Sequence, residues 1–123
     1  MKISTKVLSG EALNFVVCKA EGHTAKLTSY GVTCYQHESN GLWVFPEYLI
    51  WADAGPIIAR ECIDLYCLRA WSEVPKNPDC WEARIFDHDE LICRFGTSAL
   101  EAAMRCFVAY KLGDEVEIPK ELK

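Results

Sequence analysis

The sequence has no long run of apolar residues and no cluster of basic ones. Charges interrupt its apolar stretches before they reach the roughly 20 residues that a membrane-spanning helix needs. The first residues, Met1 to Lys6, lack the apolar core of a secretory signal peptide. No two Lys or Arg residues are adjacent, and 13 basic residues stand against 18 acidic ones. We therefore expect a cytosolic protein that binds neither a membrane nor nucleic acid, because nucleic-acid affinity depends on neutralising phosphates.

Familiar catalytic and metal-binding motifs are missing too. The sequence holds no phosphate-binding loop, dinucleotide-binding glycine motif, nucleophile elbow or zinc-protease motif. Cys34 and His37 have a spacing found in zinc sites, and Cys62 and Cys67 would complete four ligands. Residues five apart on a strand point to opposite faces, however, which separates the last two thiols. We predict no catalytic residue, no metal and no cofactor, with a cysteine nucleophile beside a histidine base left as an alternative.

The seven cysteines are scattered without a repeated spacing. In a reducing compartment a free cysteine behaves as a small and readily buried apolar residue. We expect most of them to fill the core.

Two helices are indicated by their ends and by their periodicity. Ser98 and Glu101 form a capping box, and Gly113 is placed to end the helix that they begin. Apolar residues then recur at helical spacing, namely Leu100, Ala103, Met104, Phe107, Val108 and Leu112. A second helix is predicted between Ser9 as N-cap and Gly22, with Leu13, Val16, Val17 and Ala20 on its buried face.

Strands are indicated by period-two alternation at 63–68, 81–86 and 91–95, with a hairpin turn at 87–90 and a longer connection at 75–79. The alternation places Asp64, Glu82, Arg84 and Arg94 on the solvent face. It turns Leu91, Cys93 and Phe95 towards the helices. Short strands are predicted at 3–7 and 116–118. The fold is therefore predicted as α+β: one domain, residues 1–123, with an antiparallel sheet of three or more strands packed against two helices in the order β-α-…-β-β-β-α.

The middle of the chain gives weaker signals. Residues 26–36 fit either one strand or a hairpin broken at Gly31, and residues 39–41 form a turn signal. Gly55 and Pro56 are typical of the N-cap and first residue of a helix, which predicts a single helical turn from Pro56 to Arg60.

The aromatic stretch at 42–51 is the best candidate for a binding site. Aromatic side chains with polar tips suit ligand pockets and protein interfaces. The start of a helix at Gly55 would offer N–H groups to an anion, and Arg60 would add a bidentate contact. An alternative is that the aromatics cover the sheet as ordinary core, with Arg60 at its rim. The candidate residues for a ligand or partner are Trp43, Phe45, Tyr48, Trp51, Asp53, Gly55 and Arg60.

Two runs carry a resemblance to a known family. One is the run of residues 51–58, Trp-Ala-Asp-Ala-Gly-Pro-Ile-Ile, followed by residues 60–63; the other is residues 102–109 leading into 112–116. Both are similar to the NinX-like proteins of bacteriophages and prophages, and the resemblance covers residues 42–123. It implies a small accessory phage protein in the cytosol of the infected bacterium, in a family without an assigned activity or catalytic residues.

Three functional hypotheses follow. The first is a non-enzymatic phage accessory protein that binds a host protein and interferes with host defence or metabolism. The second is a protein that binds or sequesters a small anionic, nucleotide-like ligand. The third is an unrecognised hydrolase or thiol enzyme. A homodimer is also expected, because the aromatic stretch is very apolar for a surface that faces water alone.

Overall fold

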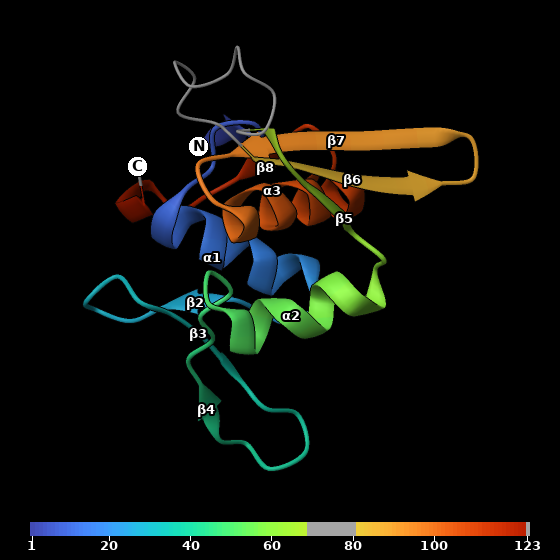
Figure 1. The fold of residues 1–123 in the computed structure, drawn as a ribbon. Coiled ribbons are helices and arrows are strands. Elements are labelled where there is room, and N and C mark those ends of the chain that lie inside the picture. The colour runs from blue at the N-terminus through green and yellow to red at the C-terminus, as the bar shows by residue number, and fades with distance from the viewer. Residues whose placement is uncertain (69–80, 123) are drawn as a thin grey trace.

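The computed structural model describes residues 1–68 and 81–122, and Figure 1 shows their arrangement. The helices are α1 (Gly10–Ala20), α2 (Trp51–Arg60) and α3 (Ala99–Leu112), with a short 3-10 turn at Lys120–Leu122. The connection predicted at 75–79 and the residue Cys80 lie outside the described residues. Within the described part, no helix combines the length and apolar character needed to cross a membrane.

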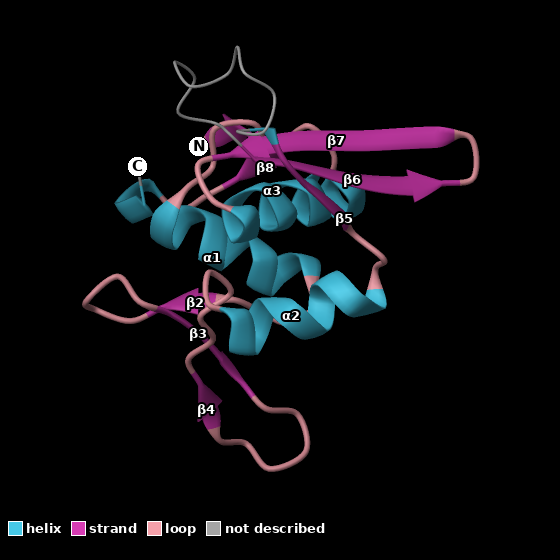
Figure 2. Ribbon diagram, in the orientation of Figure 1, coloured by secondary structure: helices cyan, strands magenta, loops and turns pink. Residues whose placement is uncertain are grey.

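The strands form three small antiparallel groups (Figure 2). The largest contains β5 (Asp64–Cys67), β6 (Trp81–Asp87) and β7 (Glu90–Gly96). A second group, here called the ribbon, contains β2 (Lys26–Leu27), β3 (Thr33–Gln36) and β4 (Trp43–Val44). The third pairs β1 (Lys2–Ser4) with β8 (Glu115–Glu117). These elements confirm the α+β class, and they show that residues 26–36 form a hairpin, with Gly31 at a φ of +76° in its turn.

Helix α3 forms the centre of the fold. The sheet β5–β6–β7 lies on one side of it and α1 on the other, the ribbon lies beyond α1, and α2 runs past α1 to contact α3 (Figure 1). Its residues Met104, Cys106 and Phe107 are completely buried. The predicted start of the helix is confirmed, because the Ser98 hydroxyl accepts a hydrogen bond from the Glu101 N–H at 3.1 Å. Glu101 itself accepts from the N–H of Thr97 at 2.9 Å, one residue before the expected donor.

The predicted facing of β7 was wrong. The turn between β6 and β7 contains only His88 and Asp89, and this short turn pairs Phe86 with Leu91 and Ala83 with Arg94. Residues 91, 93 and 95 therefore lie on the same face as Arg84 and Phe86, away from α3. Arg94 lies on the opposite face and is 8% exposed. The turn sets the register, and a shift of one residue reverses every side chain of a strand.

Glu82 also differs from the solvent-facing residue that the pattern predicted. It is 8% exposed, although it lies on the outer face of the sheet with Asp64 and Arg84. Both guanidinium nitrogens Nε and Nη2 of Arg84 donate to its carboxylate, at 2.9 and 3.2 Å. The Arg84 guanidinium in turn lies 4.5 Å from the Tyr66 ring. The ion pair and the ring above it shield the carboxylate from water.

Two buried arginines join the N-terminal segment to the rest of the fold. Arg94 donates to the Thr5 hydroxyl at 3.2 Å and to Asp114 Oδ1 at 2.6 Å. Arg105 donates from Nε to the Leu8 carbonyl at 2.6 Å and from Nη1 to the Phe95 carbonyl at 2.8 Å. A buried guanidinium is tolerated when oxygen acceptors surround it. These two side chains therefore link the segment around Thr5–Leu8 to β7, to α3 and to Asp114, two residues after α3.

Candidate functional site

The stretch 42–51 does not enter the core as a unit. Five of its large apolar side chains are strongly exposed: Leu42 (65%), Trp43 (49%), Phe45 (56%), Ile50 (45%) and Trp51 (59%). We call these five residues the aromatic surface. Tyr48, by contrast, is only 6% exposed and belongs to the core. The interpretation of the stretch as ordinary core therefore holds for Tyr48 but not for Trp43, Phe45 or Trp51.

The Asn14 side chain on α1 anchors the middle of this stretch through two hydrogen bonds. It is 6% exposed. Its Nδ2 donates to the Pro46 carbonyl at 2.9 Å, and its Oδ1 accepts from the Tyr48 N–H at 2.7 Å. Burying an amide is favourable only when its polar atoms find partners. The backbone on both sides of residue 47 is thus fixed by one side chain of α1.

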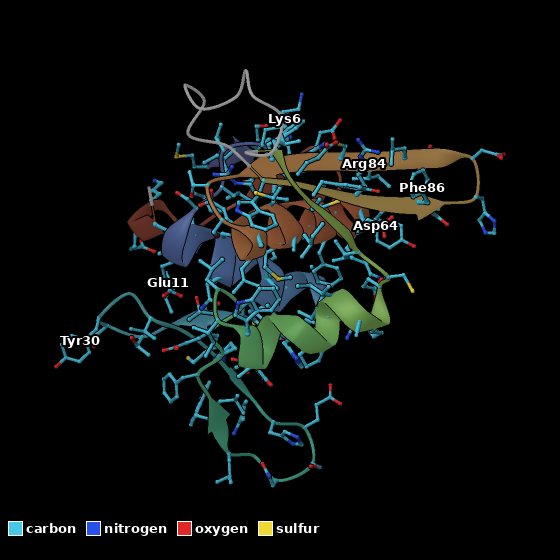
Figure 3. All side chains as sticks on the ribbon, in the orientation of Figure 1. Lys6, Glu11, Tyr30, Asp64, Arg84 and Phe86 are labelled. Atoms are coloured by element: carbon cyan, nitrogen blue, oxygen red, sulfur yellow. The ribbon has the colours of Figure 1, made fainter. Side chains whose placement is uncertain are left out.

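The Glu11 side chain anchors the ribbon to α1. It lies between the start of α1 and the β2–β3 part of the ribbon (Figure 3). Its Oε2 accepts hydrogen bonds from the Thr33 N–H at 3.1 Å, from the Thr33 hydroxyl, and from Asn14 Nδ2 at 3.0 Å. Thr33 is completely buried. The first two turns of α1 therefore hold both the ribbon and the aromatic stretch in place.

Asp53 positions the same stretch from the other side. Its Oδ2 accepts a hydrogen bond from the Glu47 N–H at 2.8 Å. It lies in the first turn of α2, where a carboxylate also suits the helix dipole. Asp53 therefore holds the backbone at Glu47, in the segment that leads into Trp51.

The prediction that a helix begins at Pro56 was wrong, although its predicted end at Arg60 is confirmed. Helix α2 begins at Trp51, so Gly55 and Pro56 lie inside it and offer no free N–H groups of a helix start. A residue before proline usually avoids helical geometry because its Cβ meets the proline ring. Gly55 has no Cβ, which allows the helix to continue through Pro56.

Arg60 lies away from the aromatic surface, at the other end of α2. The rise of an α-helix separates it from Trp51 by about 14 Å along the axis. Its Nη2 contacts Glu21 Oε2 and its Nε contacts Glu61 Oε2, each at 2.7 Å. The hydrogen bonds that Arg60 donates to Glu21, followed by the one it donates to Glu61, hold the pKa of Arg60 above its usual range. Two carboxylates already neutralise this guanidinium, so an incoming anion would have to compete with them.

The ribbon and the end of α1 bring together residues that no sequence motif grouped with one another. The His23 ring, in the connection after α1, stacks on the Tyr35 ring of β3 with 3.7 Å between centroids. A cavity of about 540 Å³ next to this stack is lined by His23, Lys26, His37 and Glu38, among others. Its lining mixes cationic, neutral and anionic groups, which does not select a ligand of one charge.

The cysteines divide by burial. Cys18, Cys34 and Cys106 are buried, Cys67 and Cys93 are partly buried, and Cys62 is exposed. The prediction of core-filling cysteines is thus right for half of the six that the structure describes. Burial is the main cause that raises the pKa of Cys18 and of Cys106 to about 12 and that of Cys93 to about 11. These three thiols stay protonated at neutral pH and are poor nucleophiles.

The zinc-like spacing of Cys34 and His37 does not produce a metal-binding cluster among the described residues. Among residues 1–68 and 81–122, no group of three or more His, Cys, Asp or Glu side chains is arranged to hold a metal ion. Cys34 is buried on β3, whereas His37 is exposed beyond the end of that strand.

The fold and the exposed surface define the class of this protein: an α+β protein that carries a rigidly anchored aromatic surface. The sequence matches a family model described as "Bacteriophage P22, NinX" over residues 5–111, and the chain belongs to this family of phage proteins. The match extends the resemblance from residues 42–123 towards the N-terminus, so that it includes α1 and the ribbon. No curated protein matches the chain. The description of the family names no activity.

Proposed function

We propose that this phage protein is not an enzyme and acts by binding a host protein in the cytosol of the infected bacterium, with interference with host defence or metabolism as the consequence. The observation that carries the proposal is the aromatic surface, in which five large apolar side chains between residues 42 and 51 are 45–65% exposed. The five residues lie within ten positions of the chain, and exposed apolar patches on soluble proteins commonly mark interaction sites. Trp and other aromatics contribute most of the binding energy in many protein interfaces.

The anchoring of the stretch supports the same proposal. Asn14 fixes the backbone at Pro46 and Tyr48, and Asp53 fixes it at Glu47. Binding to a preformed surface loses less conformational freedom than binding to a mobile loop. The exposed Phe45 and Trp51 are thus presented by backbone that needs no further ordering.

Phe45 and Trp51 provide the test, with Phe86 as a matched control. Phe86 is 63% exposed and lies on the sheet rather than on the aromatic surface (Figure 3). The double variant Phe45→Ala/Trp51→Ala should lose retention of a specific host protein from infected cells, while Phe86→Ala should keep it. Equal retention by both variants would overturn the proposal.

A second copy of the chain is a competing occupant of this surface. If the aromatic surface forms a homodimer, the wild-type mass measured by light scattering will be about twice that of the Phe45→Ala/Trp51→Ala variant. The small-anion hypothesis receives less support, because Gly55 lies within α2 and Arg60 is paired with Glu21 and Glu61.

A further inference from the structure

A shallow groove adjoins the aromatic surface. It has a volume of about 210 Å³ and lies between the start of α1 and the segment before α2, lined by Gly10, Glu11, Asn14, Glu47, Leu49 and Ile50. Ile50 belongs to both the groove and the aromatic surface, so the two are continuous. A partner that covers the aromatic surface at Ile50 therefore also borders this groove.

The walls of the groove combine apolar and acidic groups. Leu49 and Ile50 are its apolar lining residues, and Glu11 and Glu47 are its acidic ones. The hydrogen bonds that Glu11 accepts within the described part of the chain all go to Oε2, which leaves Oε1 for another donor. Glu47 is exposed, and its backbone N–H rather than its carboxylate is bonded to Asp53.

The surroundings of the groove are also acidic. Asp53 in the first turn of α2 carries further negative charge beside Glu47, and the whole chain has a net charge of −5. Lys26 places one cation beside the aromatic surface, with its ammonium 5.6 Å from the Trp43 ring, whereas Arg60 lies at the far end of α2 and is paired with Glu21 and Glu61. Complementary charge at an interface speeds association and excludes partners of the same sign.

We infer that the partner bound by the aromatic surface presents a basic segment, and that one of its Arg or Lys side chains enters this groove. The inference rests on the proposed function and specifies the chemistry of the partner. The aliphatic stem of such a side chain packs on Leu49 and Ile50, as long basic side chains do on apolar surfaces. Its charged end reaches Glu47 and the free Oε1 of Glu11.

The dipole of α1 opposes a cation at this place, because Gly10 is its first residue. The positive end of a helix is equivalent to roughly half an elementary charge. Two carboxylates carry four times that charge with the opposite sign. The electrostatic balance of the groove therefore favours a cation.

A random-peptide library selected on the immobilised full chain tests the inference without a known partner. Peptides that bind wild type but not Trp51→Ala should be enriched in Arg and Lys over Asp and Glu. Glu47→Lys should weaken their binding about tenfold or more, the change expected for reversing one charge of a close ion pair. Glu90→Lys makes the same charge change in the distant β6–β7 hairpin and should alter binding less than about twofold. Glu47→Gln should give an intermediate loss, and circular dichroism should show all variants folded.

The other possible results of the selection distinguish failure of this inference from failure of the proposed function. Trp51-dependent peptides without basic enrichment, or with binding unchanged by Glu47→Lys, would overturn the inference and leave the proposed function standing. A selection that yields only peptides equally bound by Trp51→Ala, or none at all, would contradict the inference and count against the aromatic surface as well.

Discussion

The side-chain oxygen of Asn14 accepts a hydrogen bond of 2.7 Å from the backbone N–H of Tyr48. Asn14 belongs to α1 and is buried, whereas Tyr48 lies in the middle of the aromatic stretch with its ring in the core. This contact, together with the bond from Asn14 to the Pro46 carbonyl, holds the backbone at Tyr48 against α1. With Tyr48 held against α1, Phe45 and Trp51 on either side of it remain exposed to solvent.

Replacing Asn14 tests this anchoring. Asn14→Ala leaves the buried Pro46 carbonyl and Tyr48 N–H without their partner, and each unsatisfied group costs about 1–3 kcal/mol. We expect the free energy of unfolding, measured by urea denaturation, to fall by about 2–4 kcal/mol. Asn40→Ala removes an exposed side chain that accepts from the Leu42 N–H, and it should cost less than about 1 kcal/mol. Equal losses in the two variants would mean that Asn14 is not the anchor.

The buried and exposed arginines should differ sharply in their contribution to stability. Arg105 donates to the carbonyls of Leu8 and Phe95 with its side chain 7% exposed, whereas the side chain of Arg60 is 49% exposed. Arg105→Met should lower the free energy of unfolding by about 3 kcal/mol, because it leaves buried acceptors unpaired. Arg60→Met should lower it by less than about 1 kcal/mol, as is usual for surface ion pairs. A larger loss for Arg60→Met than for Arg105→Met would contradict this assignment.

Glu82 should make the protein sensitive to acid. Its hydrogen bonds from Arg84 are the main cause that lowers the pKa of Glu82 below its ordinary value of 4.5, with a smaller contribution in the same direction from Cys93. Because the pKa is lowered in the folded state, the carboxylate stabilises the fold above pH 4.5 and this contribution disappears as the pH falls through the folded-state pKa. Urea denaturation at several pH values should therefore show a less steep loss of stability in acid for Glu82→Gln than for wild type. Parallel curves for the two proteins would refute this role of Glu82.

Thiol labelling should follow burial. Cys62 is exposed, while burial raises the pKa of Cys18 and of Cys106 to about 12. Brief treatment of the native protein with iodoacetamide at neutral pH, followed by peptide mass mapping, should modify Cys62 well before Cys18 or Cys106, because the thiolate is the reactive form. Denaturation should make the three rates similar. Rapid modification of Cys18 in the native protein would revive the thiol-enzyme hypothesis.

The elements that could be predicted from sequence are those determined by local signals. Ser98, Glu101 and Gly113 mark α3 because capping and helix termination act within a few residues. The facing of β7 could not be predicted from its alternating pattern, since both faces of that strand carry apolar residues. The length of the turn at His88–Asp89 decided the register instead, and Arg94 became buried because Thr5 and Asp114, distant in sequence, offer it acceptors.

The candidate site was predicted only in outline. Composition identified residues 42–51 as aromatic, but exposure depends on contacts with α1 that are remote in sequence, such as Asn14 with Tyr48. Arg60 and Gly55 were grouped with Trp51 because they are near it in the chain. A continuous α2 separates Arg60 from the aromatic surface and encloses Gly55, which a one-turn helix would not have done.

Site-specific photo-crosslinking in infected cells tests the binding surface most directly. A photoreactive phenylalanine analogue would replace Phe45 in one variant and Phe86 in another, two phenylalanines that are 56% and 63% exposed. Our account predicts that irradiation joins a specific host protein to the variant labelled at position 45 and not to the one labelled at position 86. Crosslinks to a host protein from position 86 alone, or to the same proteins from both positions, would contradict it.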